Sequence, residues 1–225
     1  MRTQKILVIV GFVLSMTACH HNPDLRSSLA TDTKADQAKA VAEAEVRLGV
    51  QYLENNDAIR AKSALLRAMQ HDPQLPAAWY TLGYLYEATG ELRKAEQCYL
   101  RSIRLAPQAG APRNNFATYL CRHGKYKEAV EAFVQAANMP DYLYVAAAYE
   151  NAGLCALLIP DDVAAAGYFQ KAVMNNPKQA ASLLELAKLY YLHGDVGQAK
   201  NYLARYELTG ESTSAAKELK MELGQ

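Results

Sequence analysis

Residues 79–107 read WYTLGYLYEATGELRKAEQCYLRSIRLAP, and this stretch contains the pattern that decides the fold. Its recurring positions are a large–small pair, an aromatic residue, a glycine, an alanine, a second aromatic residue and a proline, which are Leu82, Gly83, Tyr86, Gly90, Ala95, Tyr99 and Pro107. Matching residues begin 34 positions earlier at Leu48-Gly49 and 34 positions later at Phe116-Ala117. Self-similarity at one fixed period predicts an array of stacked repeats.

The repeated residue types have a physical reason if each unit is a pair of antiparallel helices. Small residues let the two helices approach closely, at Gly49, Gly83, Ala117, Gly153 and Ala187 in the first helix and at Ala61, Ala95, Ala129, Ala165 and Ala199 in the second. Large residues are expected to fill the gap between units, at Leu65, Tyr99, Phe133, Phe169 and Leu203. Glycines suit the left-handed turn between the helices, at Gly90, Gly124 and Gly194. Prolines end the second helices, at Pro73, Pro107 and Pro177.

This pattern resembles the tetratricopeptide repeat, with Trp79 at the tryptophan position of the second unit. The resemblance implies an all-α fold, a right-handed superhelical solenoid of antiparallel helix pairs. We expect repeats at 42–75, 76–109, 110–143, 146–179 and 180–213, with two extra residues near 144–145. Because the last unit needs a cover for its apolar face, residues 214–223 are predicted to form a capping helix with Ser214 as its N-cap. Residues 34–41 are expected to extend the first helix.

The first residues have the layout of an export signal. Arg2 and Lys5 precede an apolar run of nine residues at 6–14, which is shorter than the roughly 20 residues of a membrane-spanning helix. The segment from Met16 to Cys19 resembles a bacterial lipobox, which implies that residues 1–18 are removed and that Cys19 carries palmitate-type acyl chains. The alternative is an ordinary signal peptide with a chance cysteine. Since His20 is not aspartate, the resemblance implies the outer membrane, facing the periplasm, and residues 19–33 are expected to be a lipidated flexible tether.

By resemblance to other tetratricopeptide arrays, the first helices line a concave face that binds protein. The expected groove residues are Tyr80, Tyr84, Glu87, Asn114, Thr118, Arg122, Glu150, Lys188 and Tyr191. Polar and aromatic side chains in the middle of this groove would suit an extended peptide or a helix. The alternative is that many of these residues merely pack against neighbouring helices.

Three cysteines follow Cys19. Cys121 and Cys155 fall late in the first helices of adjacent units, at the same level of the array, so a disulfide between them is geometrically reasonable in an oxidising compartment. Cys98 lies in a second helix and is expected to be a buried apolar residue. No CxxC or His-x-His spacing supports the alternative of a metal site.

Composition and motifs argue against catalysis and nucleic-acid binding. The chain has 24 basic and 23 acidic residues, and without Arg2 and Lys5 the net charge is 22 minus 23, or −1, with no basic stripe. HExxH, GxGxxG, P-loop and GxSxG motifs do not occur. We therefore predict a protein that is not an enzyme and that has no catalytic residue, no metal, no cofactor apart from the lipid on Cys19, and no small-molecule substrate or nucleic-acid partner.

Two stretches carry a closer resemblance. Residues 114–121 read NNFATYLC and residues 149–155 read YENAGLC, with YKEA at 126–129. These stretches look like the type IV pilus biogenesis and stability lipoproteins of the PilW/PilF type, although Phe116-Ala117 stands where that family has Tyr-Gly. The resemblance implies a pilotin or stability factor, whose groove binds the pilus secretin or another pilus assembly protein. The second hypothesis is a general periplasmic scaffold for cell-wall synthesis or outer-membrane protein assembly.

Overall fold

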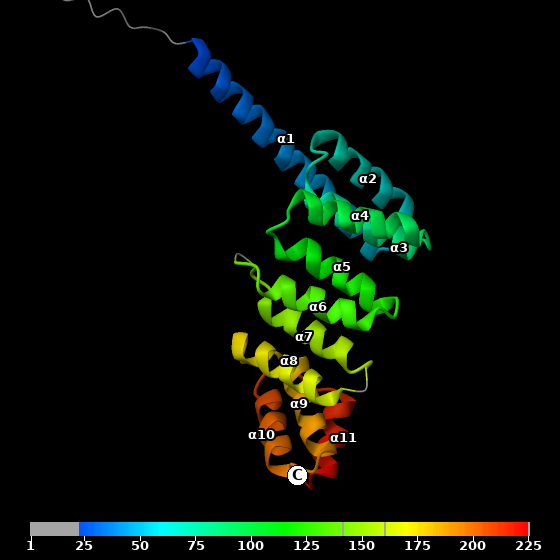
Figure 1. Ribbon diagram of the computed structural model, residues 1–225, viewed down its shortest axis with the longest axis vertical. Coiled ribbons are helices and arrows are strands. Elements are labelled where there is room, and N and C mark those ends of the chain that lie inside the picture. Colours follow the sequence, from blue (N-terminus) through cyan, green and yellow to red (C-terminus); the bar gives the residue numbers. More distant parts are fainter. Residues whose placement is uncertain (1–22, 141, 160, 225) are drawn as a thin grey trace, which may run out of the picture. The chain divides into compact units, whose positions relative to one another are not determined.

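The computed structural model describes residues 23–140, 142–159 and 161–224, and over these ranges the regular structure is helical, without any strand (Figure 1). The helices are α1 (Pro23–Glu54), α2 (Ala58–His71), α3 (Pro76–Ala88), α4 (Leu92–Leu105), α5 (Gly110–Arg122), α6 (Tyr126–Ala137), α7 (Val145–Ala156), α8 (Asp162–Asn175), α9 (Ala180–Leu192), α10 (Val196–Glu207) and α11 (Ser214–Glu222). A boundary between two compact units falls between Gln37 and Ala38, and the second unit contains the whole array. The predicted all-α class is confirmed.

Within each helix pair, a large residue of the second helix lies against a small residue of the first. A Cβ atom added to Gly49 would lie 2.9 Å from Leu65, and one added to Gly83 would lie 3.2 Å from the ring of Tyr99. The sequence predicted that these large residues fill the gap between units. The structure corrects this, because they fill the gap between the two helices of their own unit. Tyr99 does both, since its ring centroid also lies 5.2 Å from that of Tyr119 in the next unit.

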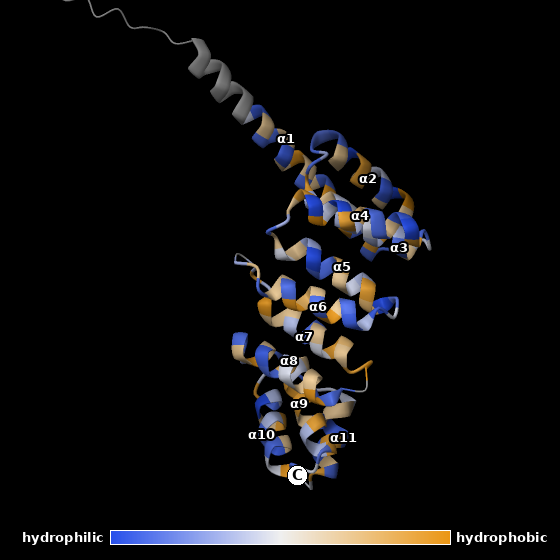
Figure 2. Cartoon of the chain, viewed as in Figure 1, coloured by the Kyte–Doolittle hydropathy of each residue, from blue (hydrophilic) through white to orange (hydrophobic). Residues whose placement is uncertain are grey.

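The large repeated positions form the centre of the core. Leu65, Tyr99, Phe133, Phe169 and Leu203 are all at most 2 % exposed. In Figure 2 the helices of the array carry both hydrophobic and hydrophilic residues, which is the composition expected of helices that bury one face. Among the described residues, no helix is both long enough and apolar enough to cross a lipid bilayer.

The turns between paired helices follow the sequence prediction. Gly90, Gly124 and Gly194 have φ angles of 79°, 78° and 79°, and Asn56 takes the equivalent place in the first unit with φ 58°. Glycine and asparagine tolerate this left-handed region better than other residues. The side chain of Asp57 then caps α2 by accepting a hydrogen bond from the backbone nitrogen of Arg60.

The ends of the array differ from the sequence prediction in two places. Helix α1 begins at Pro23, so residues 23–33 are helical where a flexible tether was expected. Residues 24–33 contain no glycine or proline, and a proline is tolerated in the first turn of a helix. The N-cap of α11 is Thr213 rather than Ser214, because the Thr213 hydroxyl accepts hydrogen bonds from the backbone nitrogen of Ala216 at 3.2 Å and from the Tyr206 hydroxyl at 3.3 Å.

Helix α11 covers the last repeat. Its residues Ala216 and Leu219, together with Leu223, are buried in the same core as α9 and α10. Lys220 also forms a salt bridge with Glu207 of α10 at 2.6 Å. The helix therefore covers apolar side chains of the last repeat, as predicted for a cap.

Candidate functional site

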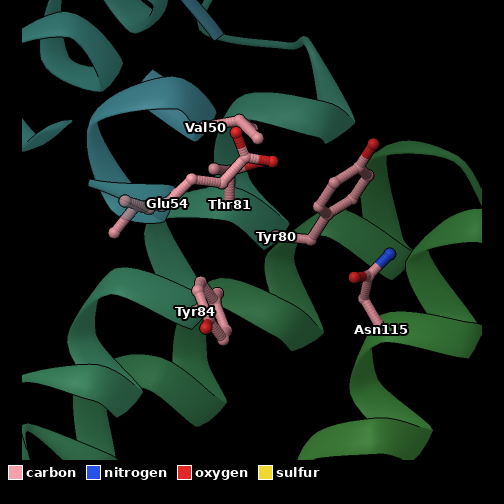
Figure 3. A pocket seen from close by; sticks show the side chains of 7 residues that line it. Val50, Glu54, Tyr80, Thr81, Tyr84 and Asn115 are labelled. Carbon is pink, nitrogen blue, oxygen red and sulfur yellow. The ribbon is translucent and has the colours of Figure 1, made fainter. Parts of the chain in front are cut away.

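A hollow with a volume of about 330 Å³ lies against α1, α3 and α5, which are the first helices of the first three repeats (Figure 3). Its lining residues are Val50, Leu53, Glu54, Tyr80, Thr81, Tyr84 and Asn115. A second hollow of about 550 Å³ shares Val50, Glu54, Tyr80 and Thr81 with the first and continues along α1 to Glu43. We call the two together the N-terminal groove.

The N-terminal groove combines apolar side chains with hydrogen-bonding groups. Burial raises the pKa of the Tyr80 hydroxyl, with a smaller effect from nearby Tyr144. Figure 3 shows the Asn115 amide directed toward Tyr80 from the neighbouring helix. Tyr84 is 42 % exposed, so its ring is accessible to a partner. Such a surface can bind the backbone and side chains of a peptide.

Glu87, predicted to face the groove, is instead at the centre of a polar cluster. Its side chain is only 8 % exposed. The Tyr99 hydroxyl donates to one carboxylate oxygen at 3.0 Å, and Arg122 and His123 contact the other at 3.4 Å and 3.2 Å. Burial and the Glu87 charge both raise the pKa of Tyr99. The cluster joins the second and third repeats, so Glu87 has a structural role.

Arg122 connects this cluster to the groove. Its guanidinium carbon lies 5.4 Å from the centroid of the Tyr84 ring, within the range of a cation–π contact. Arg122 is therefore held by Glu87 on one side and by Tyr84 on the other. The predicted groove residue acts here by fixing the orientation of the tyrosine that lines the hollow.

Three further predicted residues are engaged within the array. Glu150 accepts hydrogen bonds from the backbone nitrogen and the hydroxyl of Ser182, at 3.0 and 2.8 Å, and so ties α7 to α9. The Thr118 hydroxyl donates to the Asn114 carbonyl at 2.9 Å. The Asn114 amide oxygen is buried without a hydrogen-bond partner among the described residues.

Asn115, rather than Asn114, lines the groove. Successive residues of a helix point about 100° apart, so an error of one position moves a side chain onto another face. Thr81 and Glu54 were also missed. Glu54 stands four residues after Val50, which also lines the groove, so the two side chains lie on one face of α1.

The last two predicted groove residues, Lys188 and Tyr191, line a different hollow of about 700 Å³ against α9, α10 and α11. We call this the C-terminal pocket. It has no lining residue in common with the N-terminal groove. Those predicted groove residues that line a hollow therefore belong to two separate sites.

A disulfide joins Cys121 of α5 to Cys155 of α7, with Cα atoms 6.0 Å apart and a sequence separation of 34 residues. The positions of these two cysteines in adjacent repeats are the basis on which the sequence predicts this pairing. Cys98 is buried as a free thiol, and its burial raises its pKa to about 11. Cys19 lies outside the described residues.

Comparison with known proteins agrees with this geometry. Models of the tetratricopeptide repeat match residues 76–109 and 114–180. The type IV pilus assembly protein PilF of Pseudomonas aeruginosa is 27 % identical over 196 residues, which is 87 % of this chain and 75 % of that protein. The chain is a tetratricopeptide-repeat homologue of PilF. The solved structure of P. aeruginosa PilF superposes with a TM-score of 0.75 at 25 % identity, covering 84 % of each chain.

A second solved structure, that of the type IV pilus biogenesis factor PilW, has the same fold. It superposes with a TM-score of 0.68 at 23 % identity over 82 % of this chain and 86 % of that one. The matched range 76–109 of this PilF homologue contains α3 and α4, and therefore Tyr80 and Tyr84. Tetratricopeptide-repeat proteins bind protein partners, so the N-terminal groove is the first candidate for a binding surface.

Metal chemistry has no evident site in the described part of this PilF homologue. No group of three or more histidine, cysteine, aspartate or glutamate side chains is placed there to hold a metal ion. The polar clusters around Glu87 and Glu150 are built from contacts between repeats.

Loss of the disulfide is expected to destabilise the array by about 3–4 kcal/mol, because the bond closes a loop of 34 residues in the unfolded chain. Urea denaturation of the oxidised protein, of the reduced protein and of a Cys121→Ser/Cys155→Ala variant measures this. A Cys98→Ala variant is the control, and its response to reductant should match that of the wild type. Equal midpoints for oxidised and reduced protein would contradict the prediction.

Proposed function

We propose that this protein is a non-enzymatic outer-membrane lipoprotein that acts in type IV pilus biogenesis by binding another pilus protein. The observation that carries the proposal is the relationship to PilF over 87 % of the chain. The N-terminal groove supports it, since the hollow offers aromatic and amide groups on the first helices of a fold that binds proteins.

The proposed partner is the secretin, the ring through which the pilus leaves the cell. In this proposal the lipid on Cys19 holds the array at the outer membrane, and the N-terminal groove receives a secretin segment during targeting and ring assembly. The disulfide between Cys121 and Cys155 is in keeping with a periplasmic position, because disulfides persist in oxidising compartments.

A groove variant is expected to abolish secretin assembly while leaving the fold intact. The variant is Val50→Ala/Tyr84→Ala/Asn115→Ala, and Val50 and Tyr84 are 38 % and 42 % exposed, so their loss leaves the core unchanged. We expect capture of secretin from detergent-solubilised outer membranes to fall at least about tenfold, since exposed aromatic residues at binding surfaces are frequent hot spots. The readout in cells is the heat-sensitive secretin multimer on unboiled gels of a deletion strain complemented with each variant.

The matched control is Gln97→Ala/Leu100→Ala on α4, which truncates exposed side chains outside the groove. Its circular dichroism and its secretin multimer should equal those of the wild type. Full complementation by the folded groove variant would place the binding surface elsewhere. An unchanged multimer in the deletion strain itself would favour the second hypothesis. In that hypothesis the protein is a scaffold for another envelope complex, which acts in cell-wall synthesis or outer-membrane protein assembly.

A further inference from the structure

The C-terminal pocket presents apolar side chains to solvent. Leu192, at the end of α9, is 70 % exposed, and Val196, at the start of α10, is 45 % exposed. Leu189 and Leu219 lie beneath them at 7 % and 4 % exposed. With a volume of about 700 Å³, the pocket can hold several large apolar side chains of a partner.

The side of the pocket that α11 forms is acidic. Glu218 and Glu222 both line it and stand four residues apart, which places them on one face of the helix. Among the described residues neither forms a salt bridge. The two lysines of α11 do not offset their charge in the pocket, since Lys220 pairs with Glu207 of α10 and Lys217 is not among the lining residues. Two like charges at this spacing repel each other, so the bare pair weakens the capping helix.

The opposite side of the pocket does not offset this charge. Lys188 lines it, but its ammonium group lies 2.7 Å from the carboxylate of Glu185, which also lines the pocket. This pair is neutral as a whole. The pocket therefore has an apolar floor and a net charge of −2 from Glu218 and Glu222.

We propose that the C-terminal pocket is a second docking site, which binds an apolar segment of a partner protein that carries lysine or arginine residues. The apolar side chains of that segment contact Leu192 and Val196, and its cations pair with Glu218 and Glu222. Charge complementarity of this kind selects partners and positions them. The site is separate from the N-terminal groove, and the proposal does not depend on the pilus assignment.

The test is the direct binding of two fluorescein-labelled model peptides of equal length. One forms an amphipathic helix with leucine on one face and lysine on the other. The second has glutamate in place of lysine. The full chain is used, with Cys19→Ser in every variant so that no lipid is present. We expect the leucine–lysine peptide to bind in fluorescence anisotropy and the leucine–glutamate peptide not to bind. Glu218→Gln/Glu222→Gln should weaken binding about fivefold, since two exposed ion pairs are lost.

The matched control is Glu128→Gln/Glu131→Gln on α6, which removes the same charge at exposed positions outside the pocket and should leave the affinity unchanged. A Leu192→Ser variant should also weaken binding. Its effect should be clearest at high salt, where charge attraction is screened and the apolar contact dominates. Equal weakening by both glutamine double variants would mean non-specific charge attraction and overturn the proposal. Loss of binding in a Tyr84→Ala variant alone would also overturn the proposal, because it would move the site to the N-terminal groove. The absence of any binding to the wild type would overturn it as well.

Discussion

Replacing Phe169 by alanine is expected to lower the free energy of unfolding by about 3–5 kcal/mol, because a fully buried aromatic side chain is removed and a cavity remains. Phe169 is 0 % exposed and lies in α8, where its ring packs against Gly153 of α7. Urea denaturation followed by circular dichroism measures the change. Val163→Ala, also in α8 but 80 % exposed, is the control and should cost less than about 0.5 kcal/mol.

The same contact predicts a non-additive pair of substitutions. A Cβ atom on Gly153 would lie 2.7 Å from the Phe169 ring, so Gly153→Ala should cost about 1–3 kcal/mol in the wild type through overpacking. In the Phe169→Ala background the ring is absent, and the added methyl group should cost much less. An equal cost in both backgrounds would show that the ring is not the obstacle.

Changing Cys19 to serine is expected to move the protein completely from the membrane fraction to the soluble fraction. In the proposed mature protein the Cys19 sulfur and amine carry three acyl chains, and each buried CH₂ contributes ~0.8 kcal/mol to membrane binding. Serine has no thiol to acylate, so the whole contribution is lost. Labelling of cells with radioactive palmitate, followed by fractionation, measures both the modification and the location.

His21→Ala is the matched control, because it changes a residue close to Cys19 without touching the proposed acylation site. This variant should take up label and remain in the membrane. Continued labelling of the serine variant, or its retention in carbonate-washed membranes, would rule out Cys19 as the anchor and leave the ordinary signal peptide as the better interpretation of residues 1–18.

Much of the fold could be predicted because its signals are local. The pairing of Gly83 with Tyr99 follows from a 34-residue pattern of small and large residues, and the left-handed turn at Gly90 follows from one residue type. The start of α1 was not predicted, because residues 24–33 have a polar composition that suits a tether as well as a helix. Polarity alone does not distinguish the two.

The candidate site was only partly predictable. Tyr80 and Tyr84 were identified from their place in the repeat, and the structure brings them together at one hollow. Glu87 and Glu150 were identified in the same way, but their carboxylates accept hydrogen bonds from Tyr99 and Ser182. Position within a repeat gives the face of a helix, whereas the partners of a carboxylate depend on which side chains neighbouring repeats contribute.

The sequence by itself determined the repeat, the pairing of helices and the turns, because these depend on residues within one period of the chain. Only the tertiary structure decided which side chains stay open to a partner. Glu87 meets Tyr99 and His123, which are 12 and 36 residues away, and Asn115 rather than Asn114 reaches the groove. The tertiary structure also divides the expected groove into the N-terminal groove and the C-terminal pocket. This division arises because α11 packs onto the last repeat and places Glu218 and Glu222 in one pocket with the α9 side chains.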